Sequence, residues 1–100
     1  MNNKIVEFRQ KLRSDILHFL YERFFCDGTF KFYSVKDIHE KLSYPLKCPD
    51  GLLYTFELNG ALAYLKELNY LTVEGNAYSI STNGIDYLES LYIKQTDNIP

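Results

Sequence analysis

The stretch LAYLKELNYLTVEGNAYSISTNGIDYL, residues 62–88, decides the fold of this 100-residue chain. Its first leucines recur every three or four residues, which is typical of a helix with one buried face. Two short β-rich runs, residues 70–73 and 77–81, then flank the turn Gly75-Asn76. Because glycine in a short turn favours antiparallel pairing of the flanking strands, the stretch predicts a helix end, a β-hairpin and a new helix.

Apolar residues at helical spacing predict four helices in all. These helices cover residues 4–25, 35–42, 55–69 and 83–93. In the middle of the first helix stands Ser14-Asp15, and one long helix or two short ones both fit the pattern.

Polar residues and prolines mark the boundaries of these helices. Ser34 and Asp37 form an approximate capping box for the second helix, and Thr82 can cap the last. The aromatic run over residues 30–33 predicts a brief strand, and the two prolines within residues 45–51 predict a loop.

The predicted element order is helix, strand, helix, helix, hairpin, helix. The fold class is therefore mainly α with a small antiparallel β-sheet. We expect one domain over residues 1–94, because no linker or repeat interrupts the pattern, and a disordered tail over residues 95–100.

Residues 34–42, 62–71 and 78–88 resemble the winged-helix superfamily, in the style of small PadR-like and MarR-like regulators. The most specific part is the last, where Gly84 follows Thr82 by two residues. The resemblance implies a DNA-binding transcriptional regulator whose third helix enters the major groove and whose hairpin, the wing, lies against the backbone.

The resemblance also implies a homodimer formed through the terminal helices. Large apolar residues are frequent there, namely Phe8, Phe24, Phe25, Leu91 and Tyr92.

The distribution of charge favours a different partner. The chain has a net charge of -2 and a pI of about 5.6. Residues 1–26 carry a net charge of +2, residues 27–54 are neutral, and residues 55–100 carry -4. The part with the third helix and the hairpin is thus acidic, whereas DNA-binding proteins neutralise phosphates with Lys and Arg. The alternative function is a non-catalytic protein–protein interaction module that presents an acidic, aromatic face of the third helix.

The candidate binding residues, for DNA or for a protein, lie on the third helix, in the hairpin turn and around the second helix. They are Phe56, Asn59, Ala63, Tyr64, Lys66, Glu67, Asn76, Lys31, Lys36 and Lys41. A competing interpretation packs Phe56 and Tyr64 beneath the loop over residues 45–51. The basic residues of the first helix are Lys4, Arg9, Lys11 and Arg13. We interpret them as a solvated face; the alternative is a docking surface for a nucleic-acid backbone or an acidic partner.

Residues with catalytic or metal-binding chemistry are few and scattered. The glycines form no phosphate-binding loop, and His18, Cys26, His39 and Cys48 lack the spacing of metal ligands. We therefore expect no enzyme activity, no metal and no cofactor. Because there is neither a membrane-spanning apolar run nor a signal-peptide pattern, we expect a cytoplasmic protein whose cysteines are reduced.

Overall fold

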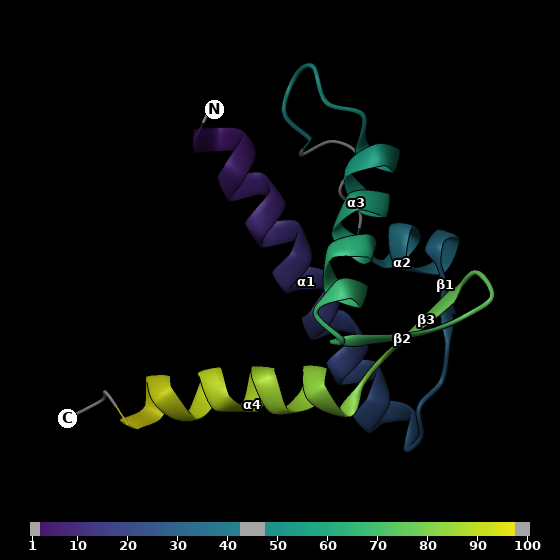
Figure 1. Cartoon of the computed structure of the whole chain (residues 1–100), viewed down its shortest axis with the longest axis vertical. Coiled ribbons are helices and arrows are strands. Elements are labelled where there is room, and N and C mark those ends of the chain that lie inside the picture. The colour runs from purple at the N-terminus through teal and green to yellow at the C-terminus, as the bar shows by residue number, and fades with distance from the viewer. Residues whose placement is uncertain (1–2, 43–47, 98–100) are drawn as a thin grey trace.

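A computed structural model describes residues 3–42 and 48–97 of the chain (Figure 1). Over these residues the fold is mainly helical with one small antiparallel sheet, which confirms the predicted class. In chain order the elements are α1 (Asn3–Asp27), β1 (Tyr33–Ser34), α2 (Val35–Leu42), α3 (Tyr54–Glu67), β2 (Leu71–Glu74), β3 (Ala77–Ile80) and α4 (Thr82–Asp97). The strand order in the sheet is β1-β3-β2. In Figure 1, the N-terminal half of α1 and most of α4 lie to the left of α3, α2 and the tip of the β2–β3 hairpin lie to the right, and the C-terminal half of α1 passes below α3.

α1 is a single long helix that continues through the possible break at Asp15. Across that point, Lys11 Nζ lies 3.1 Å from Asp15 Oδ2, an i,i+4 ion pair that supports the helix. The helix ends at Gly28, whose φ is 69° and whose N–H donates to the carbonyl of Phe24 at 3.0 Å. Glycine accepts this left-handed conformation at little cost, which explains why the helix stops there.

β1 is shorter and later than predicted. The sequence predicted a strand over residues 30–33, but β1 covers only Tyr33–Ser34, where Tyr33 pairs with Tyr78 of β3. The ring of Phe30 lies 4.4 Å from the ring of Phe24, centroid to centroid. This aromatic contact keeps Phe30 against the end of α1, so the chain joins the sheet only after it.

α2 begins with the predicted capping box. The N–H of Asp37 donates to Ser34 Oγ at 3.1 Å, and the N–H of Ser34 donates to Asp37 Oδ2 at 3.4 Å. The two side chains therefore each satisfy a backbone donor at the start of the helix.

The hairpin also forms as predicted. β2 and β3 pair from Leu71↔Ile80 to Glu74↔Ala77, around a two-residue loop that begins with Gly75 at a φ of 60°. Glycine at this first loop position is what a tight II′ hairpin turn requires.

α3 ends at Glu67, two residues before the predicted end. Asn69 adopts a left-handed φ of 63° and donates its N–H to the carbonyl of Lys66 at 2.9 Å. The N–H of Tyr70 donates to the carbonyl of Leu65 at 3.0 Å. This pair of bonds is a Schellman motif, which closes the helix and turns the chain into β2.

α4 starts and ends differently from the prediction. Ser81, rather than Thr82, caps the helix, because Ser81 Oγ accepts the N–H of Gly84 at 3.0 Å. The helix then runs to Asp97, so the predicted disordered tail is wrong for residues 95–97, while residues 98–100 lie outside the described residues. No glycine or proline occurs between Gly84 and Pro100, so no strongly helix-breaking residue stops the helix earlier.

The core forms around α1, which contacts α2, α3, α4 and β3. The largest fully buried side chains come from α1, α2, α3 and β3 and are Leu12, Ile16, Ile38, Leu58, Leu62, Leu65 and Ile80. Since α1 and α3 each contribute to this cluster, their packing fixes which side chains meet along their shared edge.

Candidate functional site

α3 presents two different sides to its surroundings. Its buried stripe is close to the predicted one, with Leu58, Ala61, Leu62 and Leu65 in the core, but Leu68 at the helix end is 44% exposed. All ten candidate binding residues are exposed. Of those on α3, Phe56 and Tyr64 line a groove that faces α1, and Asn59 lines a cleft that faces α2.

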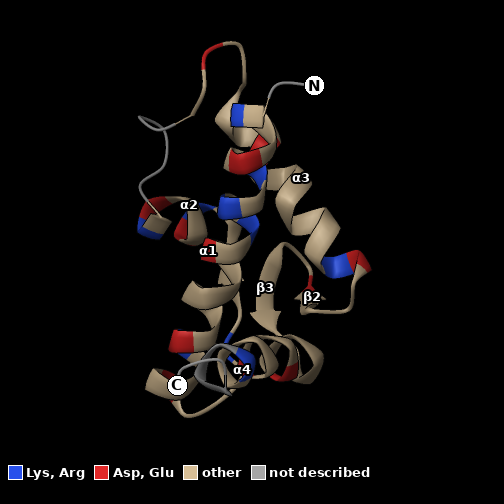
Figure 2. Ribbon diagram, turned by 90° about the vertical axis from the view of Figure 1, so that its left-hand side faces the viewer, with Lys and Arg blue, Asp and Glu red and all other residues tan. Residues whose placement is uncertain are grey.

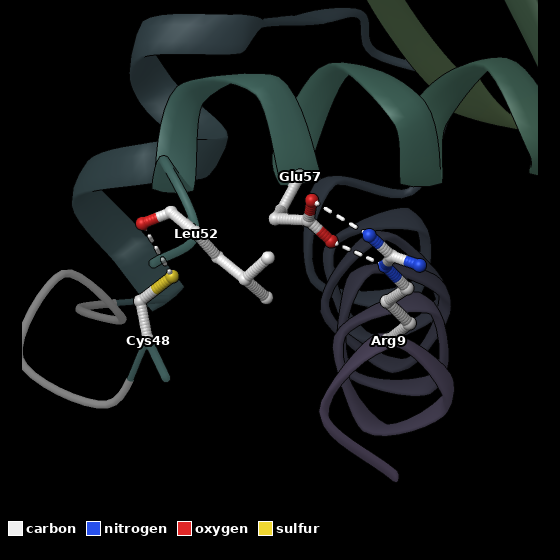
Figure 3. A network of polar contacts seen from close by, with 4 residues as sticks. All are labelled: Arg9, Cys48, Leu52 and Glu57. Atoms are coloured by element: carbon white, nitrogen blue, oxygen red, sulfur yellow. Dashed lines mark hydrogen bonds and ion pairs between the residues drawn. The ribbon is translucent and has the colours of Figure 1, made fainter. Parts of the chain in front are cut away.

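On the α1 side, Arg9 binds Glu57 through two parallel contacts (Figure 3). Arg9 Nε lies 2.6 Å from Glu57 Oε1, and Arg9 Nη2 lies 3.2 Å from Glu57 Oε2. Only 12% of the Glu57 side chain is exposed. The hydrogen bond and the negative charge of Glu57 raise the pKa of Arg9. A bidentate pair of this kind fixes both side chains, so Glu57 presents no uncompensated charge to a ligand.

One turn further along α1, Arg13 covers the ring of Tyr64. Its guanidinium carbon lies 4.1 Å from the ring centroid, which is a cation–π contact. Arg9 and Arg13 were interpreted as part of a solvated face, and that interpretation is wrong because both fold against α3. Figure 2 shows the basic residues of α1 concentrated in its N-terminal half, while α3 carries blue only in its last turn.

A groove of about 200 Å³ lies between α1 and α3. It is lined by Arg9, Arg13, Phe56, Glu57, Gly60 and Tyr64, together with the buried residues Leu12 and Ala61. Phe56 is 67% exposed and Tyr64 is 49% exposed, so the interpretation that packs both rings beneath the loop over residues 45–51 is wrong. Residues 45–47 of that loop lie outside the described residues.

A second cleft, of about 300 Å³, lies on the other side of α3, against α2. It is lined by Val35, Lys36, His39, Thr55, Leu58 and Asn59. Two of the candidate binding residues, Lys36 of α2 and Asn59 of α3, line this same cleft. Lys31 lies apart from both cavities, with its Nζ 5.6 Å from the ring centroid of Tyr33. Ala63, Lys66, Glu67, Asn76 and Lys41 line neither cavity.

Arg9, Arg13 and His39 line these cavities although sequence reasoning did not select them. The signal for the two arginines was present, since they stand one helical turn apart and flank Leu12, which is buried. Helical spacing therefore places them beside the buried stripe of α1 and not opposite it. The partner of Arg9 on α3 is Glu57, which lies 48 residues further along the chain. No local sequence pattern identifies a pair so far apart.

Within residues 3–42 and 48–97, no group of three His, Cys, Asp or Glu side chains is placed to hold a metal ion. Cys26 and Cys48 are free thiols. Cys48 Sγ donates to the carbonyl of Leu52 at 3.6 Å (Figure 3), and burial raises the pKa of its thiol, with Glu57 adding to the effect. A raised pKa lowers the thiolate fraction at neutral pH, which makes Cys48 a poor nucleophile.

Among the described helices, none combines the length and the apolar character needed to cross a membrane. Comparison of the chain with protein-family models, with curated proteins and with solved structures finds no match.

Proposed function

We propose that this chain is a winged-helix protein that binds DNA as a cytoplasmic transcriptional regulator. The observation that carries the proposal is the arrangement of elements: α2 and the hairpin lie beside α3, away from α4 and from the N-terminal half of α1 (Figure 1). The element order and the strand order β1-β3-β2 are those expected for a helix-turn-helix core followed by a wing. In this arrangement, α3 would enter the major groove and the hairpin would approach the phosphates.

The side of α3 that faces α2 has suitable side chains. Asn59 offers the amide that pairs with adenine edges, and Lys36 offers a cation for phosphate. Both line the same cleft. Glu67 at the end of α3 and Glu74 at the end of β2 are exposed, and their negative charges repel phosphate. We therefore expect few phosphate contacts and moderate affinity for DNA.

A salt titration with a random duplex tests this function. If Lys31, Lys36, Lys41 and Lys66 each contact one phosphate, the logarithm of the affinity should fall with the logarithm of salt concentration with a slope of about -4, at roughly -0.9 per contact. Lys36→Ala should remove one phosphate contact and make this slope less negative by about 0.9. Lys94→Ala, near the end of α4, is the matched control and should leave the slope unchanged. Absence of binding at low salt would exclude the DNA function.

A second function, the binding of a protein partner, is favoured by a specific observation. Phe56 is 67% exposed and Tyr64 is 49% exposed along the groove that faces α1. Aromatic side chains at the surface are the typical anchors of protein interfaces. This second function uses the α1 side of α3, whereas DNA would use the α2 side.

We also propose that the chain forms a homodimer through α1 and α4. A groove of about 650 Å³ between these helices is lined by Tyr21, Leu88, Leu91 and Ile93 among others. Phe25, Leu91 and Tyr92 are exposed, as such an interface requires, whereas Phe8 and Phe24 pack partly buried against the core.

Sedimentation velocity from low to high micromolar concentration tests this assembly. The wild-type chain should sediment as a dimer, and Ile93→Asp should shift it to a monomer, because it places a charge on an apolar surface. Asn83→Asp, an exposed polar position in the first turn of α4, is the control and should leave the dimer intact. A wild-type chain that stays monomeric throughout would contradict the proposal.

A further inference from the structure

We infer that the groove between α1 and α3 binds an acidic peptide, with one apolar side chain held between Phe56 and Tyr64 and a neighbouring carboxylate on Arg13. This inference rests on the protein-binding function proposed above and is independent of DNA binding on the α2 side. It follows from the charge, the size and the position of the groove.

The sequence of α3 suggests a negative groove, but the residues that line it carry a net positive charge. α3 contributes the carboxylate of Glu57, but α1 contributes two guanidinium groups, Arg9 and Arg13. Arg9 is held by Glu57 through two contacts, and the two charges compensate each other. The groove therefore carries one uncompensated positive charge, on Arg13.

The guanidinium of Arg13 has N–H donors available for a ligand. Its guanidinium lies over the ring of Tyr64, and within residues 3–42 and 48–97 it forms no hydrogen bond or ion pair. Stacking on a ring holds the guanidinium plane in place but leaves its N–H groups available. A positioned guanidinium binds a carboxylate through two parallel hydrogen bonds, and such charge-assisted bonds are the strong ones.

The size of the groove sets the kind of ligand. Its volume of about 200 Å³ is below the range of sites for cofactors and other small molecules, roughly 300–1,000 Å³, and suits one large side chain. Gly60 opens the groove, since nothing lies within 4 Å of the position that a Cβ would take there. The exposed rings of Phe56 and Tyr64 flank this opening and offer an apolar anchor site.

A nucleic acid fits this groove less well than a peptide does. A phosphate backbone is bound by several cations in a row, whereas this groove offers one uncompensated cation, Arg13. One carboxylate, by contrast, matches one guanidinium. A peptide in which an acidic residue adjoins an aromatic or large aliphatic residue satisfies both features of the groove.

Selection from a display library of random heptapeptides on the full-length chain tests the inference. Peptides in which Asp or Glu adjoins a large apolar residue should be enriched, and Gly60→Leu, which fills the groove from an open helical position, should abolish the enrichment. For the best peptide, fluorescence anisotropy should show that Arg13→Gln weakens binding roughly tenfold or more. Lys11→Gln is the matched control, because Lys11 pairs with Asp15 on its own helix, and it should not change the affinity.

Each other outcome has a distinct meaning. Enrichment of apolar peptides without acidic residues would overturn the acidic ligand and keep the protein-binding function, whereas no enrichment over Gly60→Leu would overturn both. If duplex DNA displaces the peptide and depends on Arg13 to the same extent, the groove belongs to nucleic acid and the inference fails. Circular dichroism of the variants confirms that they are folded.

Discussion

Gly84→Ala should lower the free energy of unfolding by about 2–3 kcal/mol, because the added methyl group has no room. Gly84 is buried near the start of α4. A Cβ built on it would overlap the carbonyl oxygen of Tyr70 and lie 2.8 Å from Cγ1 of Ile80. The carbonyl is a backbone atom that also accepts the N–H of Ser81 at 3.0 Å, so it cannot move aside without breaking that bond. For a domain of this size the loss corresponds to a fall in Tm of roughly 10–20 °C.

Gly60→Ala is the control and should raise the free energy of unfolding instead of lowering it. Gly60 is also a helical glycine, but nothing lies within 4 Å of its Cβ position, and the residue is exposed. Replacing glycine by alanine in such an open helical position stabilises a protein by about 1 kcal/mol. Thermal melts measure the Tm of both variants. If the Tm of Gly84→Ala equals or exceeds that of the wild type, α4 does not pack against the carbonyl of Tyr70.

Leu62→Ala should cost about 3 kcal/mol, since it removes a fully buried side chain from the middle of the core. Leu62 lies on the stripe of α3 that faces the core, together with Leu58 and Leu65. The assignment of the six candidate binding residues on α3 to its outer sides depends on this orientation. Chemical denaturation of the variant measures the loss directly.

Tyr64→Ala, two residues further along the same helix, is the matched control for Leu62→Ala. Tyr64 is half exposed, and its ring contacts the guanidinium of Arg13 at the surface, so its removal should cost only about 0.5–1 kcal/mol. Similar large losses for both variants would mean that Tyr64 belongs to the core and does not form a binding surface.

Local features of the sequence were sufficient for most of the secondary structure. The capping box of Ser34 and Asp37 and the Gly75 turn use side chains and conformations within a few residues of one another. Such interactions are readable from spacing alone. The errors lie at element ends, where distant contacts compete: Phe30 stays with Phe24 of α1 and delays the start of β1.

The sequence predicted which residues of the candidate site are exposed, but it did not predict the charge of the site. The six candidate residues on α3 are exposed, because the leucine spacing fixes which side of that helix is buried. The charge of the site was not predictable in the same way. Counting charges by segment makes the half of the chain with α3 acidic, but the structure places Arg9 against Glu57 and Arg13 against Tyr64.

The amino-acid sequence by itself determined the helices, the hairpin and the inward side of α3, because periodicity, caps and turns act between neighbours in the chain. The tertiary structure alone decided the two sides of α3 and the sign of the charge on each. Electrostatic interactions depend on distance in space, and the packing of α1 against α3 brings together residues that the chain separates by almost half its length.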